Sequence, residues 1–109
     1  IKRKPKVTRW PRLLFIHLNR YRVENQNYKK NPVHVTVPFS LIFKNYNNEY
    51  INYNLVSMIN HNGSSPFSGH YTSTLILPNQ QFIEIDDEEA HLNREPSPMS
   101  IYLLLYSQE

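Results

Sequence analysis

The chain contains no cysteine, only two glycines and a single alanine, Ala90, among its 109 residues. The absence of cysteine excludes disulfides, thiolate metal sites and a cysteine nucleophile within this chain. The scarcity of alanine, set against eight Tyr, five Phe and one Trp, favours strands over helices. A chain of this length forms one domain, or part of one, with a modest core.

Long hydrophobic runs are also missing. The longest apolar stretches, Leu13–Ile16 and Ile101–Leu105, are far shorter than the roughly 18 residues of a membrane-spanning helix. We therefore expect no membrane partner. The chain starts at Ile1 rather than at Met, and we interpret it as a piece of a longer reading frame.

The net charge of +3 conceals an uneven distribution. Residues 1–30 carry ten Lys and Arg against Glu24 alone, whereas residues 81–109 carry seven acids against Arg94 alone. The basic segment Ile1–Lys6 is compatible with a nucleic-acid contact or a nuclear address. No aromatic residue interleaves with it, so we expect no nucleic-acid partner and interpret it as a solvated end of a larger domain.

The pattern of apolar residues predicts a mainly β protein built from antiparallel strands. Residues 24–32, 44–48 and 60–69 are polar or rich in breakers and predict loops, and residues 86–98 predict irregular structure with room for one short helical turn. The expected strands are Leu13–Leu18, Val33–Val37, Tyr50–Ile59, Tyr71–Leu77, Gln81–Ile85 and Ser100–Tyr106, with a brief apolar segment at Phe39–Phe43.

The most informative segment is the hairpin predicted around Pro78-Asn79-Gln80. A turn centred on Pro78 places His70 opposite Asp86, on the same face of the ladder and with Cβ atoms about 5 Å apart. A shift of one residue brings Asp87 to that position instead, and the sequence leaves this choice open.

A histidine held by a carboxylate is half of a nucleophilic triad, in which the acid sets the tautomer and the second ring nitrogen takes a proton. By itself, the pattern also fits an ordinary exposed hairpin. A metal site of His61, His70, His91 and Asp86 is chemically conceivable. Its spacings match no known pattern, so we expect neither a metal nor a cofactor.

Five short motifs follow one another between Pro11 and Tyr106, and together they favour a catalytic role for the predicted His–Asp pair. They are Pro11–Tyr21, Val37-Pro38, Tyr53-Asn54-Leu55, the box His61-Asn62-Gly63 to Gly69-His70-Tyr71 with Phe82 and Asp86-Asp87, and Ile101–Tyr106. In this order they resemble the C-terminal, histidine-bearing part of the ubiquitin-specific proteases, a family of cysteine deubiquitinases. Asn19, Phe82 and Ile101 depart from the usual Lys, Trp and Ala of that family, and none of them touches the His–Asp pair.

The resemblance implies that residues 1–109 are the C-terminal (palm) part of a papain-like α+β cysteine protease domain, whose cysteine box lies upstream. It implies that His70 is the general base and Asp86 its orienting acid, with Asp87 as a possible second acid. It also implies that Gly69, Tyr71, His61 and Gly63 border the channel for the ubiquitin tail. The alternative for His61 is a structural or solvent-facing position in a loop.

Two function classes follow. The resemblance implies a fragment of a thiol-dependent deubiquitinase, which hydrolyses isopeptide and peptide bonds at the ubiquitin C-terminus in the cytoplasm or nucleus. Its partners would be ubiquitin or ubiquitinated proteins and the missing N-terminal half, without which it would be inactive. The alternative is a non-catalytic ubiquitin-binding or scaffold module of the same fold, and the presence of both His70 and Asp86 favours the enzyme. With the covering segment missing, Leu14, Ile16, Leu103 and Leu105 are expected to form an exposed apolar face.

Overall fold

A computed structural model describes residues 7–109, which form antiparallel β-structure with no helix in that range. The basic segment Ile1–Lys6 lies outside the described residues. The expected mainly β, antiparallel architecture is confirmed. In the described part of the chain, no helix is long and apolar enough to span a membrane. The strands are β1 Leu13–His17, β2 Tyr21–Glu24, β3 Asn27–Lys30, β4 Ser40–Lys44, β5 Tyr50–Ser65, β6 Ser68–Ile76, β7 Phe82–Asp86, β8 Glu89–Leu92 and β9 Ile101–Gln108.

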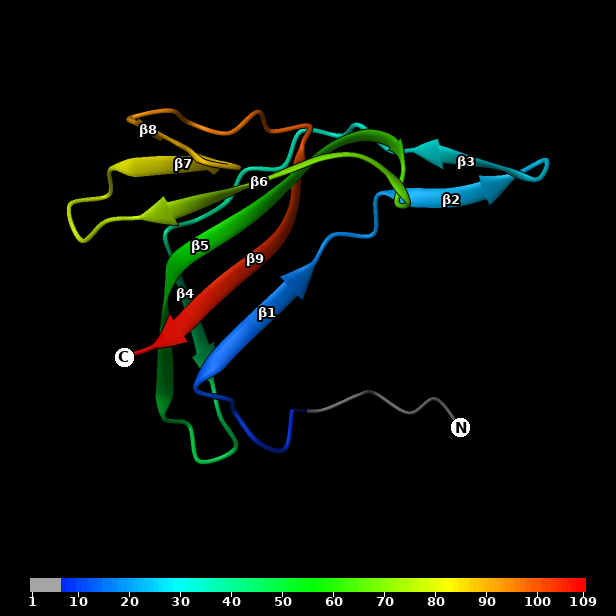
Figure 1. The fold of residues 1–109 in the computed structure, drawn as a ribbon. Coiled ribbons are helices and arrows are strands. Elements are labelled where there is room, and N and C mark those ends of the chain that lie inside the picture. The colour runs from blue at the N-terminus through cyan, green and yellow to red at the C-terminus, as the bar shows by residue number, and fades with distance from the viewer. Residues whose placement is uncertain (1–6) are drawn as a thin grey trace, which may run out of the picture.

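The main sheet has the strand order β1-β9-β5-β6-β7-β8, with β4 also paired to β5, and β2–β3 form a separate hairpin. β5 is the longest strand, with 16 residues: its first part pairs with β4, its later part with β6, and β9 pairs along it as well. The β5–β9 register shifts twice, and such bulges bend a strand. The sheet accordingly arches in Figure 1, and the β2–β3 hairpin projects from one end.

The core lies on one face of this sheet because alternate strand residues point to the same side. Trp10, Leu14 and Ile16 are among the partly buried residues that pack against it. The buried cluster consists of Ile51, Tyr53, Leu55, Met58, Ile101, Leu104 and Tyr106.

The opposite face carries the exposed apolar side chains of β1, Leu13 and Phe15. The expectation that Leu14 and Ile16 share an exposed face with Leu103 and Leu105 is wrong. β1 pairs Phe15 with Leu105 and His17 with Leu103, and these pairs share a face. Leu14 and Ile16 therefore point to the core side.

Two predictions for residues 24–38 are also wrong. The expected loop at 24–32 contains β3, which pairs with β2 around a two-residue turn at Asn25 and Gln26, where φ is 52° and 68°. The expected strand Val33–Val37 has no ladder partner among the described residues. The predicted alternation of buried and exposed side chains is nevertheless present, because Val35 and Val37 are half-buried and their neighbours are exposed.

The expected loop at 60–69 is a continuation of the sheet, since β5 runs to Ser65 and β6 begins at Ser68. The expected irregular stretch at 86–98 contains β8, which pairs with β7 after a turn at Asp87 and Glu88. No helical turn forms in that stretch. His70 belongs to the β5–β6 hairpin, and the turn of the β7–β8 hairpin places Asp87 beside it.

Candidate active site

His70 on β6 and Asp86 at the end of β7 are in direct contact. The Nε2 atom of His70 lies 2.5 Å from Oδ1 of Asp86, which confirms the predicted contact. The register behind the prediction is wrong by two residues. The observed pairs Ser73–Ile85 and Thr74–Glu84, once extended, put Thr72 rather than His70 opposite Asp86. The contact is therefore diagonal across one face of the ladder, a distance that a histidine and an aspartate can span.

The register differs because the hairpin turn is centred on Asn79 rather than on Pro78. The amide of Leu77 donates to the carbonyl of Gln81 at 2.9 Å, and that of Gln80 donates to the carbonyl of Leu77 at 2.8 Å. Gln80 has φ of 65°, a left-handed conformation that the sequence did not indicate.

Asp87 lies in the turn after β7 and is exposed, with φ of 52°. Its nearest ligand atom lies within 4.8 Å of those of His70 and Asp86, so it adds negative charge beside the ring. Asp86 is the acid that makes the hydrogen bond. His61 and His91 do not complete the conceivable metal set, because His61 is buried and bonded elsewhere and His91 contacts Glu89 at 3.1 Å.

The pKa of His70 is raised, first by the hydrogen bond to Asp86 and next by the charge of Asp86. Desolvation opposes these two effects, and the charges of Asp87 and Glu84 make smaller contributions that raise the pKa further. Because the carboxylate only accepts, the proton of a neutral His70 resides on Nε2. Its Nδ1 atom is then free to accept a proton from another group. Both side chains are partly exposed, so water screens their attraction. They line an open hollow together with Asp87, Glu88 and Glu89.

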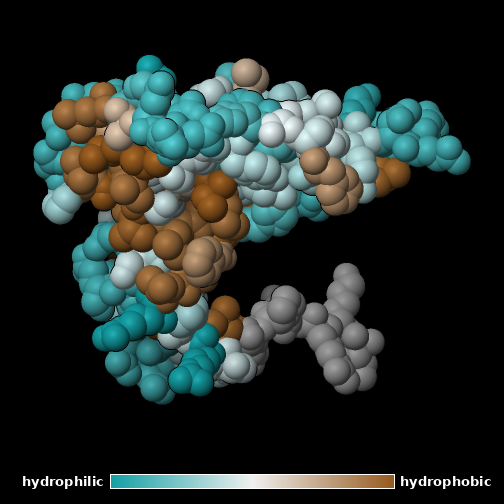
Figure 2. All heavy atoms as spheres, in the orientation of Figure 1, coloured by the Kyte–Doolittle hydropathy of each residue, from teal (hydrophilic) through white to brown (hydrophobic). Residues whose placement is uncertain are grey.

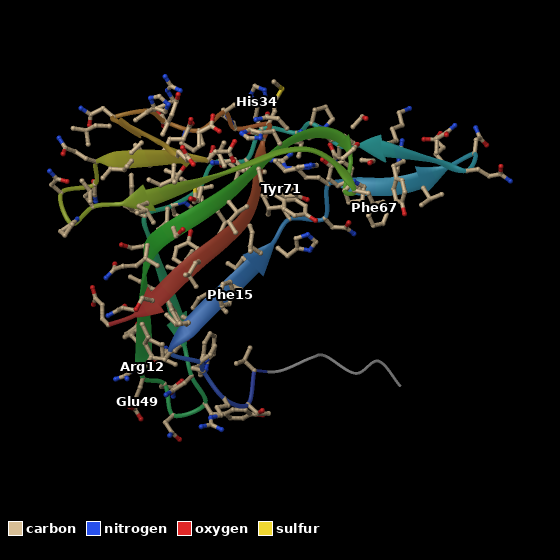
Figure 3. All side chains as sticks on the ribbon, in the orientation of Figure 1. Arg12, Phe15, His34, Glu49, Phe67 and Tyr71 are labelled. Atoms are coloured by element: carbon tan, nitrogen blue, oxygen red, sulfur yellow. The ribbon has the colours of Figure 1, made fainter. Side chains whose placement is uncertain are left out.

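The four residues expected along a substrate channel differ in depth, from the exposed surface to the buried interior. Gly69 and Tyr71 are exposed on either side of His70, and Gly63 is half-buried. His61 is only 1% exposed and stacks on Tyr71, so it lies behind the surface and is no solvent-facing loop residue. Phe67, which is labelled in Figure 3, lies in the turn between β5 and β6. Its ring packs edge-on against that of Tyr28 of β3.

No pattern in the sequence indicated the role of Tyr21 beyond its place in the Pro11–Tyr21 motif. Its hydroxyl contacts Nδ1 of His61 and lies 3.0 Å from the carbonyl oxygen of Gly63. This contact joins residues 40 positions apart in the chain, so no local pattern could have predicted it.

Comparison with known proteins agrees with the fold. The family model described as ubiquitin carboxyl-terminal hydrolase matches residues 2–106. The chain therefore belongs to the ubiquitin carboxyl-terminal hydrolase family.

Individual relatives show how much of such a protein the chain represents. It is 31% identical over 104 residues to ubiquitin carboxyl-terminal hydrolase 4 of Arabidopsis thaliana, which covers 92% of this chain and 28% of that protein. It is 28% identical over 108 residues to ubiquitin carboxyl-terminal hydrolase 24 of the same plant, covering 94% of this chain and 18% of the relative. The chain thus spans less than a third of the length of these relatives.

A solved structure shares the fold. The chain aligns with a TM-score of 0.77 and 23% identity to part of the SAGA DUB module that was solved bound to ubiquitin aldehyde. The alignment covers 91% of this chain and 25% of the other.

Proposed function

We propose that this chain supplies the histidine general base and its orienting aspartate to a thiol-dependent deubiquitinase. The observation that carries the proposal is the hydrogen bond between His70 and Asp86, in a chain that belongs to the ubiquitin carboxyl-terminal hydrolase family. The reaction is hydrolysis of isopeptide or peptide bonds at the C-terminus of ubiquitin.

Each residue has a defined task in this proposal. Asp86 accepts a hydrogen bond from Nε2–H of His70, which orients the ring and stabilises its cationic form. Nδ1 then takes the proton of a cysteine thiol, and the resulting thiolate attacks the carbonyl carbon of the scissile bond. This chain has no cysteine, so the thiol belongs to the part of the relatives' length that the chain does not span, and residues 1–109 alone are inactive.

The substrate side of the proposal rests on the surface around His70. Gly69 and Tyr71 border the ubiquitin tail, with Gly63 beneath them. Ubiquitin as the partner is carried over from the names of the relatives and from the DUB module solved with ubiquitin aldehyde. The cytoplasm or nucleus remains the proposed location.

The test uses the complete protein in which this sequence occurs, with a ubiquitin-amide reporter as substrate. His70→Ala should lower kcat by on the order of 10³-fold or more, because the thiol loses its base. His91→Ala is the matched control: it removes a nearby imidazole that also contacts an acid, and activity should remain.

The 109-residue chain alone should show no turnover and no labelling by a thiol-reactive ubiquitin probe. The reading frame upstream of Ile1 should encode the cysteine. Labelling of the isolated chain, or full activity of His70→Ala, would contradict the proposal.

A further inference from the structure

His61 is buried in β5, and both of its ring nitrogens have partners. Its Nε2 atom lies 2.9 Å from the carbonyl oxygen of Ser68, and its Nδ1 atom contacts the hydroxyl of Tyr21. A carbonyl only accepts, so Nε2 of His61 carries a proton. The hydroxyl of Tyr21 has a single proton, which lies between Nδ1 of His61 and the carbonyl oxygen of Gly63. The orientation of the imidazole is thus set from both sides.

Two glycines make room for this ring. A Cβ atom on Gly69 would lie 2.9 Å from Nε2 of His61 and 2.3 Å from the carbonyl oxygen of Asn62. A Cβ atom on Gly63 would lie 3.0 Å from Cε1 of His61 and 2.2 Å from the carbonyl oxygen of Ser68. The backbone of the β5–β6 hairpin therefore closes directly onto the imidazole.

The ring of His61 contacts both sequence neighbours of His70. Gly69 packs against its Nε2 edge, and the Tyr71 ring stacks on its face with centroids 4.2 Å apart and an interplanar angle of 25°. Among the described residues, the side chain of His70 itself has one hydrogen-bond partner, Asp86, and is half-exposed. The backbone around His70 is therefore held through His61, and this backbone sets the direction in which the catalytic imidazole points.

Tyr21 is itself held firmly, although β2 lies outside the main sheet. The preceding residue, Arg20, is buried, and its guanidinium donates to the carbonyls of Ile101 at 2.5 Å and Pro98 at 2.8 Å, at the start of β9. It also donates to the carbonyl of Val33 at 2.8 Å. The position of Tyr21 is thus set by the contacts of Arg20 with the start of β9, and Tyr21 in turn holds the ring of His61 in place.

We propose that Tyr21 and His61 are positioning residues for His70: their contact holds the imidazole of His61 against Gly69 and Tyr71 and so keeps His70 within hydrogen-bonding distance of Asp86. The consequence for catalysis rests on the proposed function, whereas the geometric consequence does not. Neither residue touches the reacting atoms.

The test is Tyr21→Phe in the complete protein, with ¹⁵N-labelled histidine. The pKa of His70 should fall toward its ordinary value of about 6.5, because the hydrogen bond to Asp86 loosens. On the ubiquitin-amide reporter, kcat should fall by about tenfold to a hundredfold, the order of loss for a reacting group displaced by about 1 Å. KM should change little.

Tyr106→Phe is the matched control. Tyr106 is also buried, and its hydroxyl donates to the carbonyl of Pro38 at 2.7 Å, away from His70. This variant should lose stability but keep the pKa of His70 and kcat. If Tyr21→Phe behaves in the same way, the proposal is overturned while the proposed deubiquitinase activity stands.

The wild-type protein provides a check that does not depend on any variant folding. Its nitrogen spectra should show His61 as the Nε2–H tautomer with a slowly exchanging proton, as expected for a buried donor to Ser68. An Nδ1–H tautomer, or rapid exchange at His61, would overturn the proposal. Failure of the deubiquitinase proposal is a separate outcome, read from His70→Ala.

Discussion

Asp86 and Asp87 are adjacent in the sequence but act differently on His70. Asp86 is the last residue of β7, and its carboxylate accepts a hydrogen bond from Nε2–H of His70. Asp87 begins the turn to β8, and it raises the pKa of His70 through its charge alone. The difference arises from the backbone, because Asp87 adopts φ of 52° and leaves the ladder at that point.

Asp86→Asn should lower the pKa of His70 toward about 6.5, because the charge and the charge-assisted hydrogen bond are lost. An NMR titration of the five histidines measures this. Glu89→Gln is the matched control, since Glu89 lines the same hollow but contacts His91. An unchanged pKa of His70 in Asp86→Asn would show that the contact does not persist in solution.

The direction of the pKa shift also sets how stability depends on pH. The pKa of His70 is higher in the folded state than in the unfolded state. The contribution of the contact to stability is therefore fully present below the unfolded pKa of about 6.5 and is lost as pH rises through the folded value. In urea unfolding experiments, wild type and Asp86→Asn should consequently differ more near pH 6 than near pH 9.

The sequence predicted the His70–Asp86 contact because the two residues flank one hairpin. The positions of Tyr21 and Arg20 were not predictable, since each binds residues far away in the chain. For His61, the sequence indicated the family motif but not its burial behind Tyr71.

At the scale of elements, the β5–β6 hairpin depends on glycine at position 69. Gly69 has φ of 119°, which side chains rarely adopt, and a Cβ there would meet the carbonyl of Asn62 at 2.3 Å. Gly69→Ala should therefore destabilise the protein by about 1–3 kcal/mol. Because the same hairpin carries His70, kcat should fall as well.

Urea unfolding together with the ubiquitin-amide reporter tests this, with Ser64→Ala on an exposed position of the same hairpin as control. A Gly69→Ala protein as stable and active as Ser64→Ala would mean that the hairpin does not hold this conformation.

The elements that were not predicted from the sequence have two physical causes. β3 and β8 were missed because the turns before them, at Asn25-Gln26 and Asp87-Glu88, lack the Asn-Gly or Asp-Gly pairs that predict a hairpin. Asn25, Gln26 and Asp87 instead adopt left-handed conformations without being glycine. Gly63 and Gly69 were interpreted as loop residues, whereas they make space for His61 within a ladder. β1 and β9 were predicted well because each contains a short apolar run whose length and composition indicate a strand without any turn signal.

At the scale of the whole molecule, the structure measures only 20 Å in its shortest dimension, and the face of the sheet that carries Leu13 and Phe15 is exposed. Figure 2 shows this face as a hydrophobic surface over β1 and β9. Leu13 and Phe15 are 50% and 60% exposed there. Contiguous apolar surface of this kind indicates a missing partner. Since the chain spans 28% of a curated relative, we expect the remainder of a full-length protein to cover this face.

Phe15→Ser should therefore have different effects in the two contexts. In the complete protein it should lower the free energy of unfolding by about 1.5–3 kcal/mol, the contribution of burying one large apolar side chain. In the isolated 109-residue chain Phe15 is already exposed, so stability should hardly change and aggregation should decrease.

Denaturant unfolding of both proteins measures the difference, and light scattering of the isolated chain measures aggregation. Val23→Ser, on the exposed β2–β3 hairpin, is the control and should have little effect on stability in either context. An equal loss of stability from Phe15→Ser in both proteins would mean that no further segment covers the sheet. A sharp, high-temperature melt of the isolated chain as a soluble monomer would lead to the same conclusion, because the uncovered face would then cost the fold nothing.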